Sequence, residues 1–156
     1  MKKIVFTLLI IFCIVSVNYG QDYSTGIGLR GGFESGVTFK HFISSKSALE
    51  AIIATRWQGF EFTGLYEVHN QAFQTERLKW YFGFGAHIGV WNGRDVYWGT
   101  PGNRYAVLGI DGILGMEYDL REIPVNIGID WKPTLNVIGY QGFWVDGGAI
   151  SIRYIF

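Results

Sequence analysis

From residue 21 onward the chain repeats one pattern, in which large apolar residues alternate with small or charged ones. Strict alternation puts successive side chains on opposite faces of a β-strand, and Gly, Asn, Ser and Pro clusters between the stretches favour turns. No stretch in this region keeps a helical period for more than two turns. We therefore predict an all-β fold with eight strands, within residues 27–30, 37–42, 49–57, 60–68, 78–90, 106–118, 125–132 and 149–156.

The two faces of these strands differ from those of a water-soluble sheet. One face carries Leu, Ile, Phe and Trp, and the other carries Gly, Ala and a few charged residues. A soluble sheet pairs its apolar face with a solvated face rich in Lys, Glu and Thr. A narrow barrel in a membrane instead has small residues and compact charged clusters inside and apolar residues towards lipid. Because a Lys or Arg at the bilayer midplane costs about 2–4 kcal/mol, the segregation of charge favours the membrane barrel.

We predict a closed eight-stranded antiparallel transmembrane β-barrel of up-and-down meander order over residues 21–156. Closure pairs the backbone groups that an open sheet would expose to lipid. An even number of strands brings both ends to the periplasmic side. Connections 33–36, 58–59, 92–104 and 139–144 then face outward, and connections 44–46, 70–77 and 119–123 face the periplasm.

The N-terminal segment has the pattern of a secretory signal peptide. Lys2 and Lys3 precede an apolar stretch over residues 4–17, and small and polar residues follow it. The stretch is shorter than the roughly 20 residues of a membrane-spanning helix, so we predict a cleaved signal peptide over residues 1–20. The single cysteine, Cys13, leaves with it, which excludes an internal disulfide and a cysteine zinc site. The formal net charge of zero gives no basic excess for nucleic acid, and we expect no nucleic-acid partner.

The C-terminal segment, residues 151–156, resembles the strand signal that the outer-membrane barrel assembly machinery reads. Ile152, Tyr154 and Phe156 share one register, and the chain ends on the aromatic residue. With the signal peptide and the eight strands, residues 21–156 resemble small OmpA/OmpX-type outer-membrane β-barrel proteins. Segments 26–42, 109–115 and 129–133 are similar to those of uncharacterised short outer-membrane barrels. The resemblance implies a bacterial outer-membrane location, with lipid and the assembly machinery as partners, and no particular activity.

Charged residues at inward positions are expected to form a structural network, because buried charges must be paired. The predicted members are Glu50, Arg56, Glu61, Glu67, Lys79, His87, Asp111, Glu117, Asp130, Lys132 and Arg153. A histidine beside carboxylates, such as His87 with Asp111 and Glu117, is also the arrangement of a general base. Lipid-modifying enzymes built on small barrels carry their reactive residues near lipid, whereas His87 points into the lumen. We therefore predict no catalytic residue.

The remaining candidate sites are weaker. His41 and His69 are each predicted to be isolated at strand ends, and no set of metal ligands converges, so we expect no metal and no cofactor. The glycine-rich segment 26–32 lacks the helix that a phosphate loop requires. Exposed Tyr, Trp and Arg favour binding surfaces, so an unknown extracellular partner could bind the longest outer loop. The loop candidates are Arg94, Asp95, Tyr97, Trp98 and Arg104.

Aromatic residues gather near the strand ends, where a membrane barrel carries interfacial girdles. The girdle candidates are Trp57, Phe60, Trp80, Tyr81, Trp91, Tyr97, Trp98, Tyr105, Tyr118, Trp131, Trp144, Tyr154 and Phe156. Because side chains just fill the interior of eight strands, we predict no open pore. The leading hypothesis is a non-enzymatic outer-membrane barrel with a structural or surface-interaction role. The alternatives are a membrane-embedded lipid-modifying enzyme and a soluble lipocalin-like binder of an apolar ligand.

Overall fold

The computed structural model describes residues 23–94, 96–120 and 122–156, except for the side chain of Glu76. The predicted signal peptide lies outside these residues. The described elements are all strands: β1 (Thr25–Gly32), β2 (Ser35–Phe42), β3 (Ser47–Arg56), β4 (Gly59–Ala72), β5 (Thr75–Asn92), β6 (Arg104–Asp119), β7 (Val125–Trp131), β8 (Thr134–Ile138), β9 (Gly142–Trp144) and β10 (Gly148–Ile155). Within these residues no helix has the length and apolar character needed to cross a membrane.

Eight of the strands close into an antiparallel barrel. β1 to β7 pair in chain order, and β10 pairs with both β7 and β1. The backbone amide of Thr25 donates to the carbonyl of Phe156 at 2.9 Å, so both ends of the barrel meet at one rim. This rim is called the terminal end, and the opposite rim the loop end. The predicted all-β class and the closed eight-stranded antiparallel barrel are confirmed.

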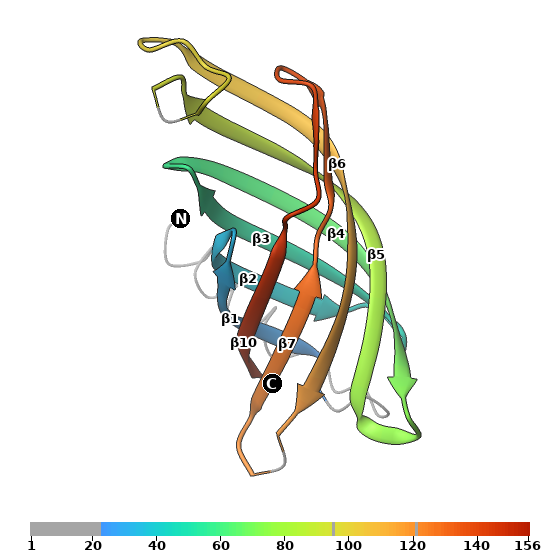
Figure 1. Cartoon of the computed structure of the whole chain (residues 1–156). Helices are drawn as coiled ribbons and strands as arrows, with labels where there is room; N and C mark the ends of the chain where they lie inside the picture. The colour runs from blue at the N-terminus through green and yellow to red at the C-terminus, as the bar shows by residue number, and fades with distance from the viewer. Residues whose placement is uncertain (1–22, 95, 121) are drawn as a thin grey trace, which may run out of the picture.

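The segment after β7 differs from the prediction. The seventh strand breaks at Pro133, which has no N–H to donate to a ladder, and the chain resumes as β8 along the upper part of β6. β9 then pairs with β8, so part of the predicted 139–144 connection is a strand rather than a loop. Figure 1 shows this hairpin continuing beside β6, beyond the loop-end limits of β7 and β10. The barrel wall is therefore taller on the side of β5, β6, β8 and β9.

Two tight turns link β3 to β4 and β4 to β5. The first has its predicted length of two residues but lies one residue earlier, and the second is shorter than predicted. Only Phe73 and Gln74 link β4 to β5, and only Trp57 and Gln58 link β3 to β4. All four residues have positive φ, between 49° and 58°. Two successive residues of this kind match the right-handed twist of the flanking strands in a hairpin. The predicted 70–77 connection is therefore mostly strand, and β4 and β5 run for 14 and 18 residues.

The barrel is apolar outside and charged inside. Leu29, Phe84 and Ile129 expose 69%, 70% and 60% of their surface on the outer wall, whereas Lys40 and Arg153 expose none. The alternation predicted from the sequence is thus seen directly in the burial of each strand.

Three of the predicted girdle residues lie inside the barrel instead. Tyr81, Trp91 and Trp144 are buried. Trp91 fits because its neighbours are small: a Cβ added at Gly59 or Gly89 would lie 2.2 Å from its indole ring.

Candidate functional site

One group of buried charges, the Lys40 cluster, fills the terminal half of the lumen. The ammonium of Lys40 lies 2.8 Å from Glu67, 3.3 Å from Glu117 and 3.4 Å from Glu50, and all four side chains are fully buried. The ammonium also lies 4.0 Å from the centre of the Tyr81 ring, a cation–π contact. These five residues come from five successive strands, β2 to β6, so the cluster ties opposite walls of the barrel together.

Arg153 of β10 joins the Lys40 cluster from the strand that closes the barrel. Its guanidinium donates to Glu50 at 2.6 Å and to Asn126 at 3.3 Å. Glu50 also accepts a short hydrogen bond from the hydroxyl of Thr38. Charge-assisted hydrogen bonds of this kind are about twice as strong as neutral ones, and here they hold β10 against β3 across the lumen.

His69 is a member of the Lys40 cluster, so the prediction that it is isolated is wrong. Its Nε2 lies 3.0 Å from Glu67 and its Nδ1 lies 3.3 Å from Glu117. The ring stacks on Tyr81 at 4.8 Å. The ring therefore lies between two carboxylates of the cluster, with Nε2 in hydrogen-bonding contact with Glu67. His41 is placed differently, half-buried with its Nδ1 2.9 Å from the hydroxyl of Thr25.

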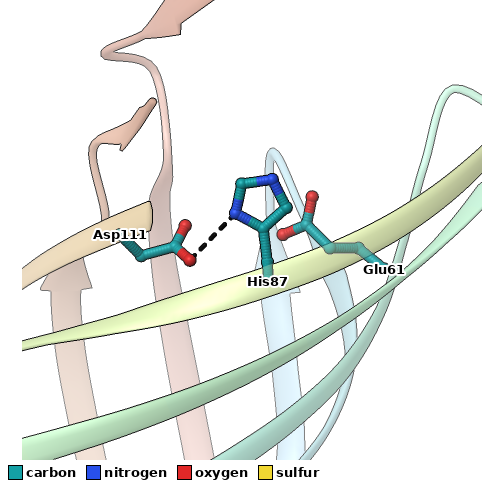
Figure 2. Close-up of side chains that lie close together, drawn as sticks. All are labelled: Glu61, His87 and Asp111. Atoms are coloured by element: carbon teal, nitrogen blue, oxygen red, sulfur yellow. Dashed lines mark hydrogen bonds and ion pairs between the residues drawn. The ribbon is translucent and has the colours of Figure 1, made fainter. Parts of the chain in front are cut away.

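A second group, the Lys132 cluster, lies nearer the loop end. The ammonium of Lys132 is 3.0 Å from Glu34, 3.0 Å from Glu61 and 3.3 Å from Asp111. Asp111 in turn accepts from His87 Nδ1 at 2.9 Å, and Figure 2 shows Glu61 on the other side of the same ring. Since Lys132 directly precedes the Pro133 break, the cluster fixes the point where β7 gives way to β8.

The Lys132 cluster has the residue types of a catalytic or metal site, but its geometry is that of a filled ionic cluster. The second nitrogen of His87 lies 2.9 Å from Asn136 Oδ1, so both ring nitrogens already have partners. Glu61, His87 and Asp111 bring one ligand atom each to within 4.8 Å of one another, so the prediction that no set of metal ligands converges is wrong. Lys132 lies against two of these groups, so an approaching metal ion would meet an ammonium already in place.

A third contact, the pair of Arg30 and Asp130, lies between the two clusters. The guanidinium donates twice to the carboxylate, at 2.5 and 2.6 Å, and Tyr81 donates to the same carboxylate at 3.3 Å. Among the described residues, the lumen holds six Lys and Arg side chains, counting partly buried Lys79, and eight carboxylates. The two buried histidines each lie against a carboxylate, His69 against Glu67 and His87 against Asp111.

The structure places all the predicted network residues inside the barrel. Ten are buried, and Lys79 is partly exposed at the terminal end, 3.3 Å from Asp119. The predicted His87, Asp111 and Glu117 group is not one site, because Glu117 belongs to the Lys40 cluster. Five further charged or titratable residues are buried in the lumen but absent from the predicted network: Arg30, Glu34, Lys40, His69 and Asp119. Alternation with Leu29 and Phe39 could have found Arg30 and Lys40, whereas Glu34 lies in a turn where alternation gives no signal.

Aromatic side chains close the loop end of the lumen. This aromatic cap consists of Trp57, Trp91, Trp98, Tyr140 and Trp144. Arg56 lies 4.2 Å from the ring centre of Trp57 and 4.8 Å from that of Trp144, and its carbonyl accepts from Trp91 Nε1 at 2.9 Å. Tyr140 stacks on Trp98 at 4.4 Å. The cap brings together rings from the β3–β4 turn, β5, the outer loop and the β8–β9 hairpin.

Arg56 also binds Asp146, at 2.7 Å, in the connection between β9 and β10. Partial burial alone would raise the pKa of Asp146, but the hydrogen bond and charge of Arg56 outweigh it and hold the pKa below its ordinary value. The pair therefore links the end of β3 to the hairpin side of the cap in its charged form at neutral pH.

The predicted outer-loop candidates differ in exposure. Trp98 is half-buried in the cap, whereas Tyr97 exposes 77% of its surface and its hydroxyl lies 3.4 Å from that of Tyr140. Arg94 and Arg104 are exposed, and Asp95 lies outside the described residues. Tyr97 is thus the member of the set that presents an aromatic ring to the surroundings.

The C-terminal residues of the predicted assembly signal lie on the outer wall. Ile152, Tyr154 and Phe156 are each more than half exposed. No known protein family matches this sequence, and no characterised protein or solved structure is similar to it. The resemblance to small outer-membrane barrels therefore stays a prediction.

Proposed function

We propose that this protein is an integral barrel of a bacterial outer membrane, with a structural or surface-interaction role and no open pore. The observation that carries the proposal is the inverted distribution of side chains around the closed barrel. Lys40, Lys132 and Arg153 are buried at its centre, while Phe84 and Leu29 face outward. Soluble monomers seldom expose apolar patches larger than a few hundred Å², whereas lipid covers such a wall at no cost.

The packing of side chains in the lumen supports a barrel without an open pore. The Lys40 cluster, the Arg30–Asp130 pair, the Lys132 cluster and the aromatic cap follow one another from the terminal end to the loop end. The two clusters are formed by side chains from opposite walls, and the Arg30–Asp130 pair joins β1 to β7 across β10. Eight strands leave an interior that side chains just fill, so solute diffusion through this barrel is not part of the proposed role.

The two alternatives fit these observations less well. A lipocalin-like binder needs an apolar cavity for its ligand, and the centre of this barrel holds paired charges. A lipid-modifying enzyme would need a reactive group within reach of lipid, and His87 is buried with partners at both nitrogens. The proposal therefore gives the paired charges a structural role.

Location and partners follow from the same proposal. The predicted signal peptide would direct export, the exposed side chains of Ile152, Tyr154 and Phe156 would serve the assembly machinery, and lipid would surround the finished wall. An extracellular partner would meet the loop end, where Tyr97 is the most exposed aromatic residue among the loop candidates.

Membrane fractionation combined with gel mobility tests the proposal. We expect the full chain to stay in the outer-membrane pellet after a carbonate wash. We also expect it to migrate faster on SDS gels unheated than boiled, because a closed barrel resists unfolding by the detergent. Release into the soluble fraction would overturn the membrane assignment and favour the lipocalin-like alternative. A change in lipid A mass on expression, abolished by His87→Ala, would instead favour the enzyme.

A further inference from the structure

A hollow of about 510 Å³ interrupts the outer wall near the loop ends of β1, β7 and β10. We call it the wall groove and define it by Gly31, Phe33, Ile129, Gly148 and Ile150. Its size lies within the range of about 300–1,000 Å³ that is usual for small-molecule sites. It lies on the outside of the barrel, apart from the lumen clusters and the aromatic cap.

Two outward glycines create the groove. A Cβ added at Gly31 or at Gly148 would meet no atom within 4 Å, so both positions face open space. Large side chains flank them: Ile150 lies opposite Gly31, and Ile129 lies opposite Ile150 on the next strand. Phe33, which is 64% exposed, follows at the end of β1. The wall is thus hollow at the two glycines, which have no side chain, and higher at the large residues beside them.

The side chains that line the groove are apolar. Asp130 contributes to the lining, but its carboxylate is turned into the lumen, where Arg30 holds it with two hydrogen bonds. A ligand that fits such a lining has no charge or hydrogen-bonding group at the contact. A flexible hydrocarbon chain meets this requirement.

We propose that the wall groove binds one acyl chain of a membrane lipid. This inference rests on the proposed membrane location, because the groove opens onto the outward apolar residues that lipid would cover. The neighbouring outward positions on the same three strands, Leu29, Ile127 and Ile152, are exposed apolar side chains, so the groove is continuous with that surface. Lipid around a barrel exchanges freely, whereas a chain seated between Phe33 and the two isoleucines keeps one position.

Gly31→Phe is the test variant, because its Cβ meets no atom within 4 Å and its ring can occupy the space of the groove. Gly64→Phe is the matched control: Gly64 also faces outward with no atom within 4 Å of an added Cβ, but lies on β4, away from the groove. Gly148→Leu fills the same groove from β10 and serves as a second variant if Gly31→Phe does not fold. Correct folding of each variant is read from the heat-dependent shift on SDS gels.

The measurement is native mass spectrometry of the full chain in detergent after incubation with palmitoyl-oleoyl phosphatidylethanolamine. We expect one retained lipid per barrel for the unmodified chain and for Gly64→Phe, and loss of that adduct in folded Gly31→Phe or Gly148→Leu. An equal adduct in all variants would overturn the proposal. So would a barrel dimer that the groove variants abolish, because a second copy would then occupy the groove. A folded, membrane-retained barrel without any adduct would refute the groove alone and leave the membrane proposal intact.

Discussion

Lys132 has no side-chain surface in contact with solvent, and three carboxylates lie within 3.3 Å of its ammonium. Removing an ammonium from water costs several kcal/mol, and close carboxylates offset that cost only while the ammonium is present. The partners come from the β1–β2 turn, β4 and β6, so one charged atom connects three parts of the barrel. Its loss would leave the carboxylates of Glu34, Glu61 and Asp111 to repel one another in a buried space.

Replacement of Lys132 by Met, which keeps much of the volume and removes the charge, should destabilise the barrel by about 3–5 kcal/mol. Lys46→Met is the matched control, because Lys46 is exposed between β2 and β3, and its effect should stay within about 0.5 kcal/mol. The free energy of unfolding is measured from the urea dependence of the fast-migrating unheated band. Equal stability of the two variants would mean that the Lys132 cluster contributes little to folding.

Strand alternation predicts which charged residues face the lumen, but not which of them touch. Glu50 and Arg153 lie on β3 and β10, far apart in the strand order, yet bond at 2.6 Å across the lumen. That contact depends on the diameter of the closed barrel, which no local pattern encodes. Likewise, His69 of β4 looks isolated along the chain but meets Glu117 of β6, two strands away.

Along β6, glycines face both ways and serve different purposes. Gly115 faces inward, and a Cβ there would lie 2.5 Å from Tyr81 Cζ and 2.8 Å from the Cβ of Asp130. Gly112 faces outward, and a Cβ there would make an ordinary contact of 3.4 Å with Pro133. The inward glycine therefore leaves room for the buried Tyr81, while the outward position can hold a methyl group without a clash.

Alanine substitutions at these two glycines should thus differ in their effect on the stability of the barrel. Gly115→Ala should destabilise the barrel by about 1–3 kcal/mol, because overpacking forces the Tyr81 ring and its bond to Asp130 to shift. Gly112→Ala should be neutral or slightly stabilising, since glycine weakens a strand interior. Urea midpoints of both variants against the unmodified chain give the comparison. If both midpoints fall by the same amount, the inward packing of Tyr81 is not what requires a glycine.

At the level of elements, the sequence predicts strands well and their interruptions poorly. Long alternating stretches such as 78–90 and 106–118 appear as β5 and β6, each extended at both ends. The β8–β9 hairpin was not predicted, because Pro133 disfavours a strand locally. β8 forms nevertheless, since β6 extends past β7 and offers it a backbone to pair with. The turn at Phe73 and Gln74 contains no Gly or Asn, the residues that usually adopt positive φ. The sequence therefore gives no signal for the positive φ values seen there.

For the molecule as a whole, the outward surface is the part that decides between a membrane barrel and a soluble one. Phe84 lies near the middle of β5 and is 70% exposed on the wall. Phe73 is 85% exposed as well, but it belongs to the β4–β5 turn at the terminal end. In water the two positions are equivalent exposed phenylalanines. In a membrane, only Phe84 would face the hydrocarbon core.

Introducing lysine at each position therefore distinguishes the two environments. In a bilayer, Phe84→Lys should lower the free energy of unfolding by about 2–4 kcal/mol, because it places an ammonium near the midplane. Phe73→Lys should change it by no more than about 0.5 kcal/mol, as an exposed turn tolerates charge. Both variants are refolded into lipid vesicles, and stability is read from the urea dependence of the heat-modifiable band. Equal tolerance of the two lysines would contradict a lipid-facing wall, since a barrel in water gains solubility from either charge and has no midplane to penalise one of them.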